Sequence, residues 1–375
     1  FAHLAEKIKA SVGIPVIAAN RINDPFTAEK ILADGKADFV GMGRALLADP
    51  ELPNKAKEGR IDEIVPCLAC SNCLAEIMAT YRDRTKPVST YCTVNPAAGK
   101  EAESVLKRAQ KPKRIFVIGA GPAGLEAAMT AASRGHSVTL YEKKNEPGGR
   151  LLIAAIPPYK EEIGNLVKSL AVRAKKAGVD IKSGVEASPE MIKKENPDVL
   201  ILATGAGPLI PGIPGIQGAN VVLAEDVLTG RKAVSGAVLV IGGGMVGCET
   251  AEFLIERIRG VTRVTVLEML DRMAENVSPT YRPFFLARLK KAGIIMRTGV
   301  KVSEIMDKGV KVLHKDGQEF IEGDAVVLAV GFKADPESVK RFKGAVPDVY
   351  PIGDCAGARM IKEAVEEGFA IGRKV

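Results

Sequence analysis

The sequence predicts an α/β fold in which the tail of a larger βα array precedes two Rossmann-like nucleotide-binding units. Residues 114–124 and residues 237–247 each read as an apolar strand, a glycine turn and the start of a helix. Residues 1–60 alternate between helical and strand patterns, which is typical of parallel βα units. These observations together define the expected fold class.

The first 60 residues hold enough pattern for two βα units, which is too little for a stable sheet. We therefore expect them to be the end of a longer array, in a chain that is the C-terminal portion of a longer protein. Pro25 near the start and Gly35 at the end of one segment are ordinary helix boundaries. The expected helices cover residues 4–12, 25–35 and 45–49, and the expected strands cover residues 14–19 and 38–43.

Four cysteines follow, with the spacing C-x2-C-x2-C-x18-C: Cys67, Cys70, Cys73 and Cys92. Three closely spaced thiolates can bind one face of an iron–sulfur cubane, and a distant fourth can complete the ligand set. Zinc sites usually show two separated C-x2-C pairs, whereas Cys92 has neither such a partner nor a histidine close by. The pattern favours a [4Fe–4S] cluster, with zinc or a redox-active C-x2-C pair as alternatives.

The first glycine turn contains Gly119, Gly121 and Gly124, and Glu142 ends the next expected strand. The first glycine allows a tight turn, the second allows a pyrophosphate to approach, and the third allows close helix–strand packing. The helix N-terminus then offers N–H groups to phosphate, and the glutamate can accept both ribose hydroxyls. A strand, a helix and an acidic residue in this register make the pattern specific.

The second glycine turn has the same parts: Gly242, Gly244, Gly247 and Glu268. Glu268 would repel a 2′-phosphate and accept a hydrogen bond from a 2′-hydroxyl, so we expect NADH rather than NADPH. Arg263 and Arg272 flank this strand and are the residues that could reverse that preference. One cluster site and two nucleotide sites in one chain indicate a path for electrons.

Composition excludes several other classes of protein. The 375 residues are 46% apolar, which is enough for a globular core, and no apolar run approaches the length of a membrane helix. The net charge is +8, but the basic residues are scattered among acidic ones and tryptophan is absent, so a nucleic-acid groove is not expected. Cysteine usage is not that of a secreted disulfide framework, and we expect a cytoplasmic protein. Cys248 and Cys355 are expected to be packing residues.

These motifs together resemble the iron–sulfur flavoprotein branch of the Old Yellow Enzyme family, which includes 2,4-dienoyl-CoA reductase, 2-enoate reductase and trimethylamine dehydrogenase. Residues 14–22 and 39–50 look like the last two strands of that family's FMN-binding (β/α)8 barrel, and residues 66–73 with 92–96 look like its cluster segment. The interval between Cys73 and Cys92 is longer than in many members, which marks residues 77–90 as a specialised loop. The resemblance implies that the FMN phosphate is held by Asn20, Arg21, Gly43 and Arg44.

The resemblance also implies further FAD contacts and a domain plan. The FAD contacts would be Gly149, Arg150, Thr204, Gly205, Gly353 and Asp354, with the N-terminus of the final helix at the flavin. The two Rossmann-like units would have the glutathione-reductase arrangement, the second inserted into the first. The expected domains are the end of the barrel (1–60), the iron–sulfur segment and linker (61–110), the FAD-binding domain (111–235 and 331–375) and the NAD(H)-binding domain (236–330).

The resemblance implies an NADH-dependent oxidoreductase that passes electrons from NADH through FAD and a [4Fe–4S] cluster to FMN. FMN would then reduce an activated C=C bond in a small-molecule enoate or enoyl thioester, with catalytic residues in the absent barrel strands. A homo-oligomer is expected, without nucleic-acid or membrane partners. Amine oxidation by the reverse electron flow remains an alternative.

Other functions fit the sequence less well. A disulfide reductase should carry a C-x4-C pair near residues 147–155, and this segment has no cysteine. The barrel-like residues 1–60 and Glu268 argue against the small subunit of a glutamate-synthase-like complex. An electron-transfer or redox-sensing module without its own substrate site stays open. A DNA-binding regulator is disfavoured because no helix-turn-helix pattern stands out.

Overall fold

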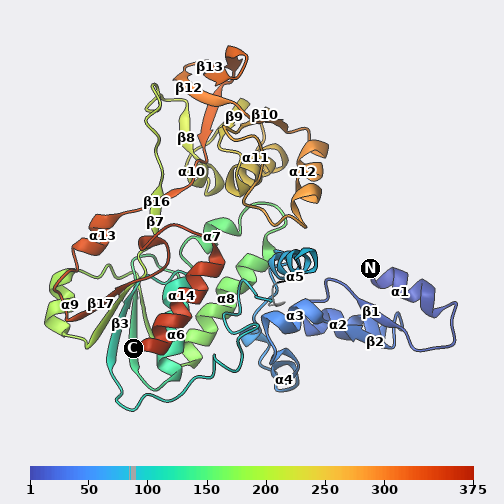
Figure 1. Ribbon diagram of the computed structural model, residues 1–375, viewed down its shortest axis with the longest axis vertical. Coiled ribbons are helices and arrows are strands. Elements are labelled where there is room, and N and C mark those ends of the chain that lie inside the picture. Colours follow the sequence, from blue (N-terminus) through green and yellow to red (C-terminus); the bar gives the residue numbers. More distant parts are fainter. Residues whose placement is uncertain (84, 86–89) are drawn as a thin grey trace.

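The computed structural model describes residues 1–83, 85 and 90–375. Part of the loop at 77–90 that the sequence marks as specialised therefore lies outside the described residues. Three regions follow one another along the chain: N-terminal helices and short strands, a segment that carries the cysteines, and two separate sheets with their helices (Figure 1).

The first sheet holds the first glycine turn. In the described part of the chain it consists, in spatial order, of β17 (Asp348–Pro351), β6 (Val199–Leu202), β3 (Arg114–Ile118), β4 (Ser137–Glu142) and β5 (Asp180–Ser183). Its neighbouring strands are parallel. β6 is buried at every position, as expected for a central strand with both faces covered. Among the described residues, one face of the sheet is covered by α6 (Pro122–Ser133), α8 (Glu161–Lys176) and α14 (Ile361–Lys374) (Figure 1).

Glycines on α14 let this helix approach α6 closely. A Cβ added at Gly368 would lie 2.4 Å from the Ala123 carbonyl oxygen, and one at Gly372 would lie 2.8 Å from the Ala127 carbonyl oxygen. Any side chain at these positions would push the helices apart. Because α6 begins at the first glycine turn, this packing fixes the turn relative to α14.

The second sheet holds the second glycine turn. Within the described residues its parallel strands are, in spatial order, β11 (Ile295–Arg297), β10 (Val261–Leu267), β9 (Gly236–Ile241), β15 (Ala325–Leu328) and β8 (Val221–Leu223). β8 precedes the predicted boundary at residue 235, yet it pairs with β15. Its helices are α10 (Ala224–Leu228), α11 (Met245–Arg257) and α12 (Arg282–Lys291).

α11 carries a buried acidic residue that α12 neutralises. Glu252 is fully buried, and the Arg288 guanidinium binds it with two hydrogen bonds of 2.6 and 2.9 Å. Arg288 also donates to the Tyr281 hydroxyl at 2.8 Å. Removing one partner of such a buried pair typically costs about 3–5 kcal/mol, because the other charge is left uncompensated. The pair therefore fixes α12 on α11.

Two antiparallel elements were not among the predicted strands. One is the meander of β12 (Lys301–Met306), β13 (Gly309–His314) and β14 (Gly317–Glu322). The other is the pairing of β7 (Ala206–Pro208) with β16 (Phe332–Ala334). The chain passes from the first sheet to the second through β7 and returns through β16. The β7–β16 pair therefore joins the two connections between the sheets. The second sheet is thus inserted into the first, as the sequence predicts.

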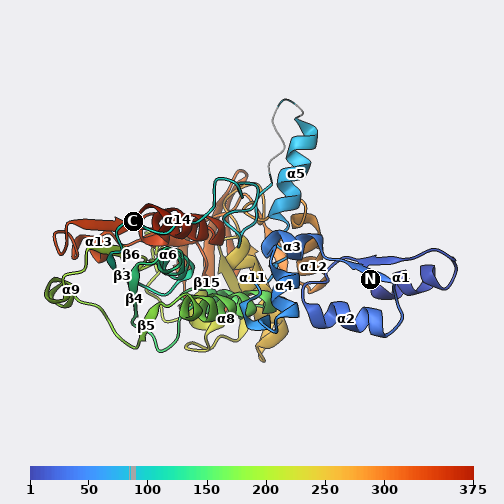
Figure 2. The ribbon, with the colours of Figure 1, turned by 90° about the horizontal axis from the view of Figure 1, so that it is seen from below.

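The N-terminal elements are α1 (Ala2–Lys9), β1 (Ile17–Ala19), α2 (Pro25–Ala33), β2 (Phe39–Gly41), α3 (Gly43–Ala48) and α4 (Leu52–Lys57). β1 and β2 are parallel, with Ile17 opposite Phe39. Both side chains are exposed, at 64% and 58%, although they are large and apolar. This region projects from the body that the two sheets form (Figure 2). A barrel tail, a cysteine segment and two Rossmann-type units confirm the predicted fold class.

The remaining described elements are short, apart from one helix in the cysteine segment. This helix, α5 (Asn72–Arg82), stands out from the body (Figure 2). The short elements are η1 (Ile61–Glu63), α7 (Leu151–Ala154), α9 (Pro189–Glu195), α13 (Pro336–Lys340) and η2 (Gly353–Cys355). No helix in the described residues has the length and apolar character needed to cross a bilayer.

Candidate cofactor sites

The first glycine turn, residues 119–124, joins β3 to α6. Gly119 has φ +103°, and a Cβ there would lie 2.3 Å from the Ala203 carbonyl oxygen. A Cβ at Gly124 would lie 1.9 Å from the Gly119 carbonyl oxygen. These two positions therefore require glycine for backbone reasons, with no ligand invoked.

Gly121 is glycine for a different reason. Its φ of −73° suits any residue, and no described heavy atom lies within 4 Å of the position of an added Cβ. Gly149, with φ +57°, borders the same space, since its own Cβ would lie 2.9 Å from the Gly121 Cα. The first turn of α6 supplies N–H groups that the helix cannot bond itself. The space fits a pyrophosphate that approaches the backbone closely.

Glu142 lies at the end of β4, beside this turn, and is buried. One carboxylate oxygen accepts from the Ala120 N–H at 2.8 Å, and the other accepts from the Lys144 N–H at 2.9 Å. Each oxygen keeps a second lone pair, so Glu142 can hold the turn and still accept from a ribose hydroxyl.

The Arg150 side chain is engaged between the two sheets. Its guanidinium donates to Glu225 at 3.1 Å and to the Ala206 carbonyl at 2.6 Å, and lies 3.8 Å from the centre of the Phe332 ring. These contacts hold the β7–β16 crossing together. The sequence-based assignment of Arg150 to FAD stays a prediction, and its observed partners are protein groups.

The other four predicted flavin contacts lie at turns that follow strands of the first sheet. The Thr204 hydroxyl is 3.2 Å from the Ser338 hydroxyl, and Gly205 has φ +78°. Gly353, with φ +63°, donates its N–H to Glu367 on α14 at 2.7 Å. Asp354 accepts from the Arg359 N–H at 3.1 Å. The ends of parallel strands are where α/β sheets bind ligands.

The second glycine turn, residues 242–247, repeats the first. Gly242 has φ +105°, and a Cβ at Gly247 would lie 1.9 Å from the Gly242 carbonyl oxygen. Glu268 accepts from the Gly243 N–H at 2.7 Å and from the Leu270 N–H at 2.8 Å, as Glu142 does in the first turn. Gly244 has an ordinary φ of −70°, and the described atoms nearest to its added Cβ belong to the Asn276 side chain.

The two arginines that could favour a 2′-phosphate have other contacts. Arg263 donates at 3.4 Å to the carbonyl of Glu322, the last residue of β14 in the antiparallel meander. Arg272 lies 3.7 Å from Glu275 in the exposed loop after Glu268. Both arginine contacts are long and exposed. Glu268, in contrast, accepts a hydrogen bond from the backbone of the glycine turn itself.

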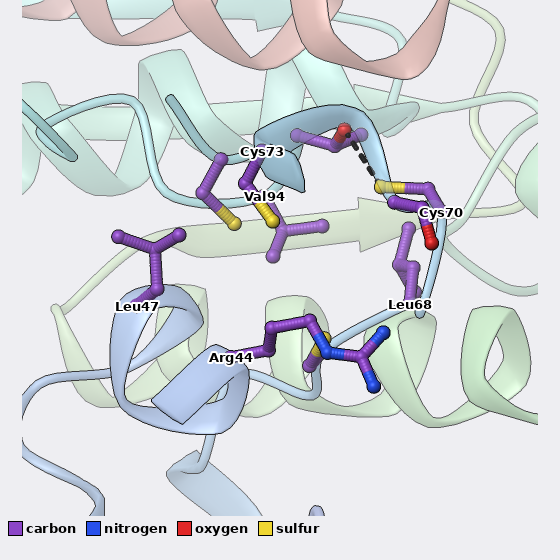
Figure 3. Close-up of a pocket in the computed structure, with 10 residues that line it drawn as sticks. Arg44, Leu47, Leu68, Cys70, Cys73 and Val94 are labelled. Atoms are coloured by element: carbon purple, nitrogen blue, oxygen red, sulfur yellow. Dashed lines mark hydrogen bonds between the residues drawn. The ribbon is translucent and has the colours of Figure 1, made fainter. Parts of the chain in front are cut away.

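The four cysteines of the motif line one small pocket together with Arg44 and Leu47 of α3. Figure 3 shows Arg44 across this pocket from Cys70 and Cys73. The rest of its lining consists of Leu68, Ser71, Thr93 and Val94. Thr93 connects two parts of this segment, since its hydroxyl lies 3.2 Å from the Cys70 sulfur and accepts from the Asn72 amide at 3.0 Å. The cysteine spacing gives no indication of these two polar residues, and the sequence analysis missed them.

The backbone around Cys70 is strained. Ala69 and Ser71, its two neighbours, have φ values of +50° and +60°, in the left-handed region that non-glycine residues rarely adopt. Each costs about 1–2 kcal/mol relative to the right-handed helical conformation. The strain turns the chain sharply, so that three cysteines within one short segment lie beside the same pocket.

Burial makes these thiols poor acids. It raises the pKa of Cys67 and Cys73, and it raises the pKa of Cys92 to about 11. Neighbouring sulfurs raise these pKa values further, while the Arg44 charge lowers those of Cys67 and Cys73. Thiolates at these positions need a compensating positive charge, which a bound metal group supplies.

Within the described residues, no group of three or more His, Cys, Asp or Glu side chains is arranged to hold a single metal ion. A tetrahedral zinc needs all its thiolates within about 2.3 Å of one point. In a multi-iron cluster each thiolate binds a different iron, so the sulfurs can stay farther apart. An all-sulfur donor set is the kind that binds an iron–sulfur cluster or a structural zinc, and the [4Fe–4S] assignment stays a proposal.

The residues predicted to hold an FMN phosphate lie together at the N-terminal end of α3. Asn20 and Arg21 have φ values of +87° and +57°, and the Asn20 amide oxygen accepts from Arg44 at 3.3 Å. No described heavy atom lies within 4 Å of an added Cβ at Gly43. Arg44 thus connects this end of α3 with the cysteine pocket, which the sequence did not indicate.

Comparison with known proteins follows the division seen in the fold. Residues 113–368 match the pyridine nucleotide-disulphide oxidoreductase family. Residues 1–63 match the NADH:flavin oxidoreductase / NADH oxidase family. An NADH oxidase from Thermoanaerobacter brockii is 44% identical over 100% of the chain and 57% of its own length. The chain belongs to the iron–sulfur flavoprotein branch of the Old Yellow Enzyme family.

Other members of this branch have related sequences and structures. A cinnamate reductase from Clostridium sporogenes is 34% identical over 99% of this chain and 54% of its own length. The structure of a 2-naphthoyl-CoA reductase complex covers 100% of this chain and 56% of that protein, with a TM-score of 0.93 and 36% identity. A 6-hydroxypseudooxynicotine amine oxidase from Pseudomonas geniculata N1 covers 100% of this chain and 58% of that protein, with a TM-score of 0.89 and 28% identity.

These matches confirm the family that the sequence motifs indicated, which is a family of oxidoreductases. The chain spans little more than half the length of the relatives that it matches. The chain is similar both to reductases and to an amine oxidase, so these similarities do not assign a direction of electron flow.

Proposed function

We propose that this chain is the electron-supplying part of an NADH-dependent iron–sulfur flavoprotein reductase that acts on an activated C=C bond, in an enoate or an enoyl thioester. The observation that carries the proposal is the combination, in one chain, of two glycine turns of similar backbone geometry with a pocket lined by four cysteines. When bound, FAD, FMN and a [4Fe–4S] cluster would supply hydride acceptance and one-electron transfer.

The chain's own residues have distinct parts in this proposal. The first glycine turn and Glu142 hold FAD through its pyrophosphate and ribose. The second glycine turn and Glu268 hold NADH in the same way, and Glu268 disfavours NADPH.

The cysteine pocket holds the cluster, and the Arg44 charge helps to keep its thiolates deprotonated. Arg44, Asn20, Arg21 and Gly43 hold the FMN phosphate at the other end of the path. The substrate groups and the catalytic acid lie outside this chain, and a cytoplasmic homo-oligomer remains our expectation.

Amine oxidation is the second candidate. The favouring observation is the amine oxidase structure, which matches the whole chain with a TM-score of 0.89. The cinnamate and naphthoyl-CoA reductases share more sequence with this chain, at 34% and 36% identity against 28%. We therefore place reduction first.

The test is an anaerobic titration of the native, full-length protein, followed by the absorbance of its flavin. We expect NADH to bleach the flavin within seconds and cinnamate or an enoyl-CoA to restore the colour. A secondary amine added instead of NADH should leave the flavin oxidised. Bleaching by the amine, with no effect of NADH, would overturn the proposal in favour of amine oxidation. If NADH bleaches the flavin and no enoate restores its absorbance, the chain is an electron-transfer module without its own substrate site.

A further inference from the structure

The two glycine turns differ at the start of the helix that follows. In the first turn the N-terminal residue of α6 is Pro122, which has no N–H to offer. In the second turn the N-terminal residue of α11 is Met245, and its N–H donates to the Asn276 side-chain oxygen at 2.8 Å. The free N–H groups of a helix's first turn are donors that can bind a dinucleotide pyrophosphate, and the second turn offers one at a position where the first turn has none. In the structure, a protein side chain uses this donor.

Asn276 lies on a loop that is anchored on both sides of it. On one side, the Ala274 N–H donates to the Gly243 carbonyl at 2.7 Å, and Ala274 adopts φ +54°. On the other side, the Ser278 hydroxyl donates to the Ser71 carbonyl at 3.3 Å, in the cysteine segment. Asn276 itself is exposed. Its side chain can therefore turn away from the helix while the loop backbone stays in place.

The space around Gly244 shows what Asn276 occupies. The three heavy atoms nearest to a Cβ added at Gly244 would be the three end atoms of the Asn276 side chain, at 3.5, 3.7 and 3.9 Å. At the matching position of the first turn, Gly121, that space is open. The Asn276 amide thus fills the region that corresponds to the open pyrophosphate space of the first site.

We propose that Asn276 is a positioning residue whose amide oxygen takes the place of a phosphate oxygen at the second turn, and that NADH must displace it to reach the Met245 N–H. The inference rests on the proposed function, in which NADH binds at the second turn. One N–H cannot donate fully to two acceptors, so the amide–helix hydrogen bond lowers NADH affinity. The first site lacks this competitor, which suits a resident FAD, whereas the second site suits a cosubstrate that must leave after each turnover.

A purely structural cap is the competing explanation. A side-chain oxygen on a helix N-terminal N–H commonly stabilises the helix. On that account, Asn276→Ala would lower stability and leave NADH affinity unchanged or weaker. On ours, the same substitution frees the Met245 donor and strengthens binding. The direction of the affinity change separates the two accounts.

The experiment measures the dissociation constant of NADH from the dependence of the anaerobic flavin-reduction rate on NADH concentration, and that of ADP-ribose by calorimetry, for the purified native protein and its variants. We expect Asn276→Ala to lower both constants about fivefold, the equivalent of one ordinary hydrogen bond. We expect Asn276→Asp to raise both at least about tenfold, because a carboxylate is a stronger acceptor and repels the pyrophosphate. ADP-ribose lacks the nicotinamide, so an equal change for both probes places the effect at the shared part of the molecule.

Asn54→Ala is the matched control, since Asn54 is an exposed asparagine on α4 that bonds Glu51. Its NADH constant should equal that of the wild type. Unchanged or weaker NADH binding in Asn276→Ala, with a normal wild-type constant, would overturn this inference alone. A wild-type protein that binds no NADH would overturn the proposed function and this inference with it.

Discussion

Purified Gly121→Ala protein is expected to contain little or no FAD, whereas Gly244→Ala protein should keep its FAD and lose NADH affinity. Both glycines have φ near −70°, so alanine fits the backbone without strain. The added methyl at Gly121 enters open space among the described residues, and at Gly244 its nearest neighbours are the end atoms of Asn276, at 3.5–3.9 Å. A pyrophosphate would be kept from the helix N–H groups in either case.

The expected size of the effect follows from the hydrogen bonds that are lost. A bond to a charged group contributes about 1.5–3 kcal/mol, so losing one weakens binding about 10- to 150-fold. FAD content is measured by absorbance after the protein is denatured, and NADH affinity is measured from the dependence of the anaerobic flavin-reduction rate on NADH concentration. Gly212→Ala is the control, because no described atom lies within 4 Å of an added Cβ there and no site includes it. Loss of FAD in Gly244→Ala but not in Gly121→Ala would reverse the assignment of the two sites.

Cys92→Ser is expected to remove most of the iron and acid-labile sulfide from the anaerobically purified protein. Cys92 is the only cysteine of the motif that follows α5, so its loss leaves the pocket with ligands from one side. Serine is a much poorer ligand for iron than a thiolate, which is why a conservative change has a large effect. Iron, sulfide and zinc are measured by elemental and colorimetric analysis.

Cys248→Ser is the matched control for this substitution. Cys248 is also buried, but it lies on α11 and its sulfur contacts the Gly243 carbonyl at 3.5 Å. Its variant should keep the full iron and sulfide content. Equal iron in both variants and the wild type would contradict the assignment of Cys92, and loss of zinc rather than iron would contradict the cluster.

Local rules predicted the parallel part of the fold well, because glycines and buried strands leave clear patterns. Gly119 and Gly242 adopt the positive φ that the turn predicts, and α6 and α11 begin within one residue of the expected positions. The β12–β14 meander was missed, although Asp316-Gly317 is a strong hairpin signal and Gly317 has φ +136°. Half-exposed strands in a meander lack the long apolar runs on which the parallel strands were recognised.

Contacts between distant segments could not be predicted from the sequence. The place of Arg150 between β7 and β16 depends on how the two sheets cross, which no local pattern records. The same holds for Asn276, whose side chain reaches α11 from a loop 31 residues further along the chain. α5 was also missed, because Thr80 is its one buried residue and its apolar periodicity is weak.

The central claim is that one chain carries an electron path with a flavin site and an iron–sulfur site. The most direct test is the content of iron, acid-labile sulfide, zinc and FAD in the native protein purified without oxygen. We predict about four iron and four sulfide per chain, as in a [4Fe–4S] cluster, together with one FAD and no stoichiometric zinc. One zinc per chain without sulfide would contradict the path, since zinc has no redox chemistry to pass electrons onward.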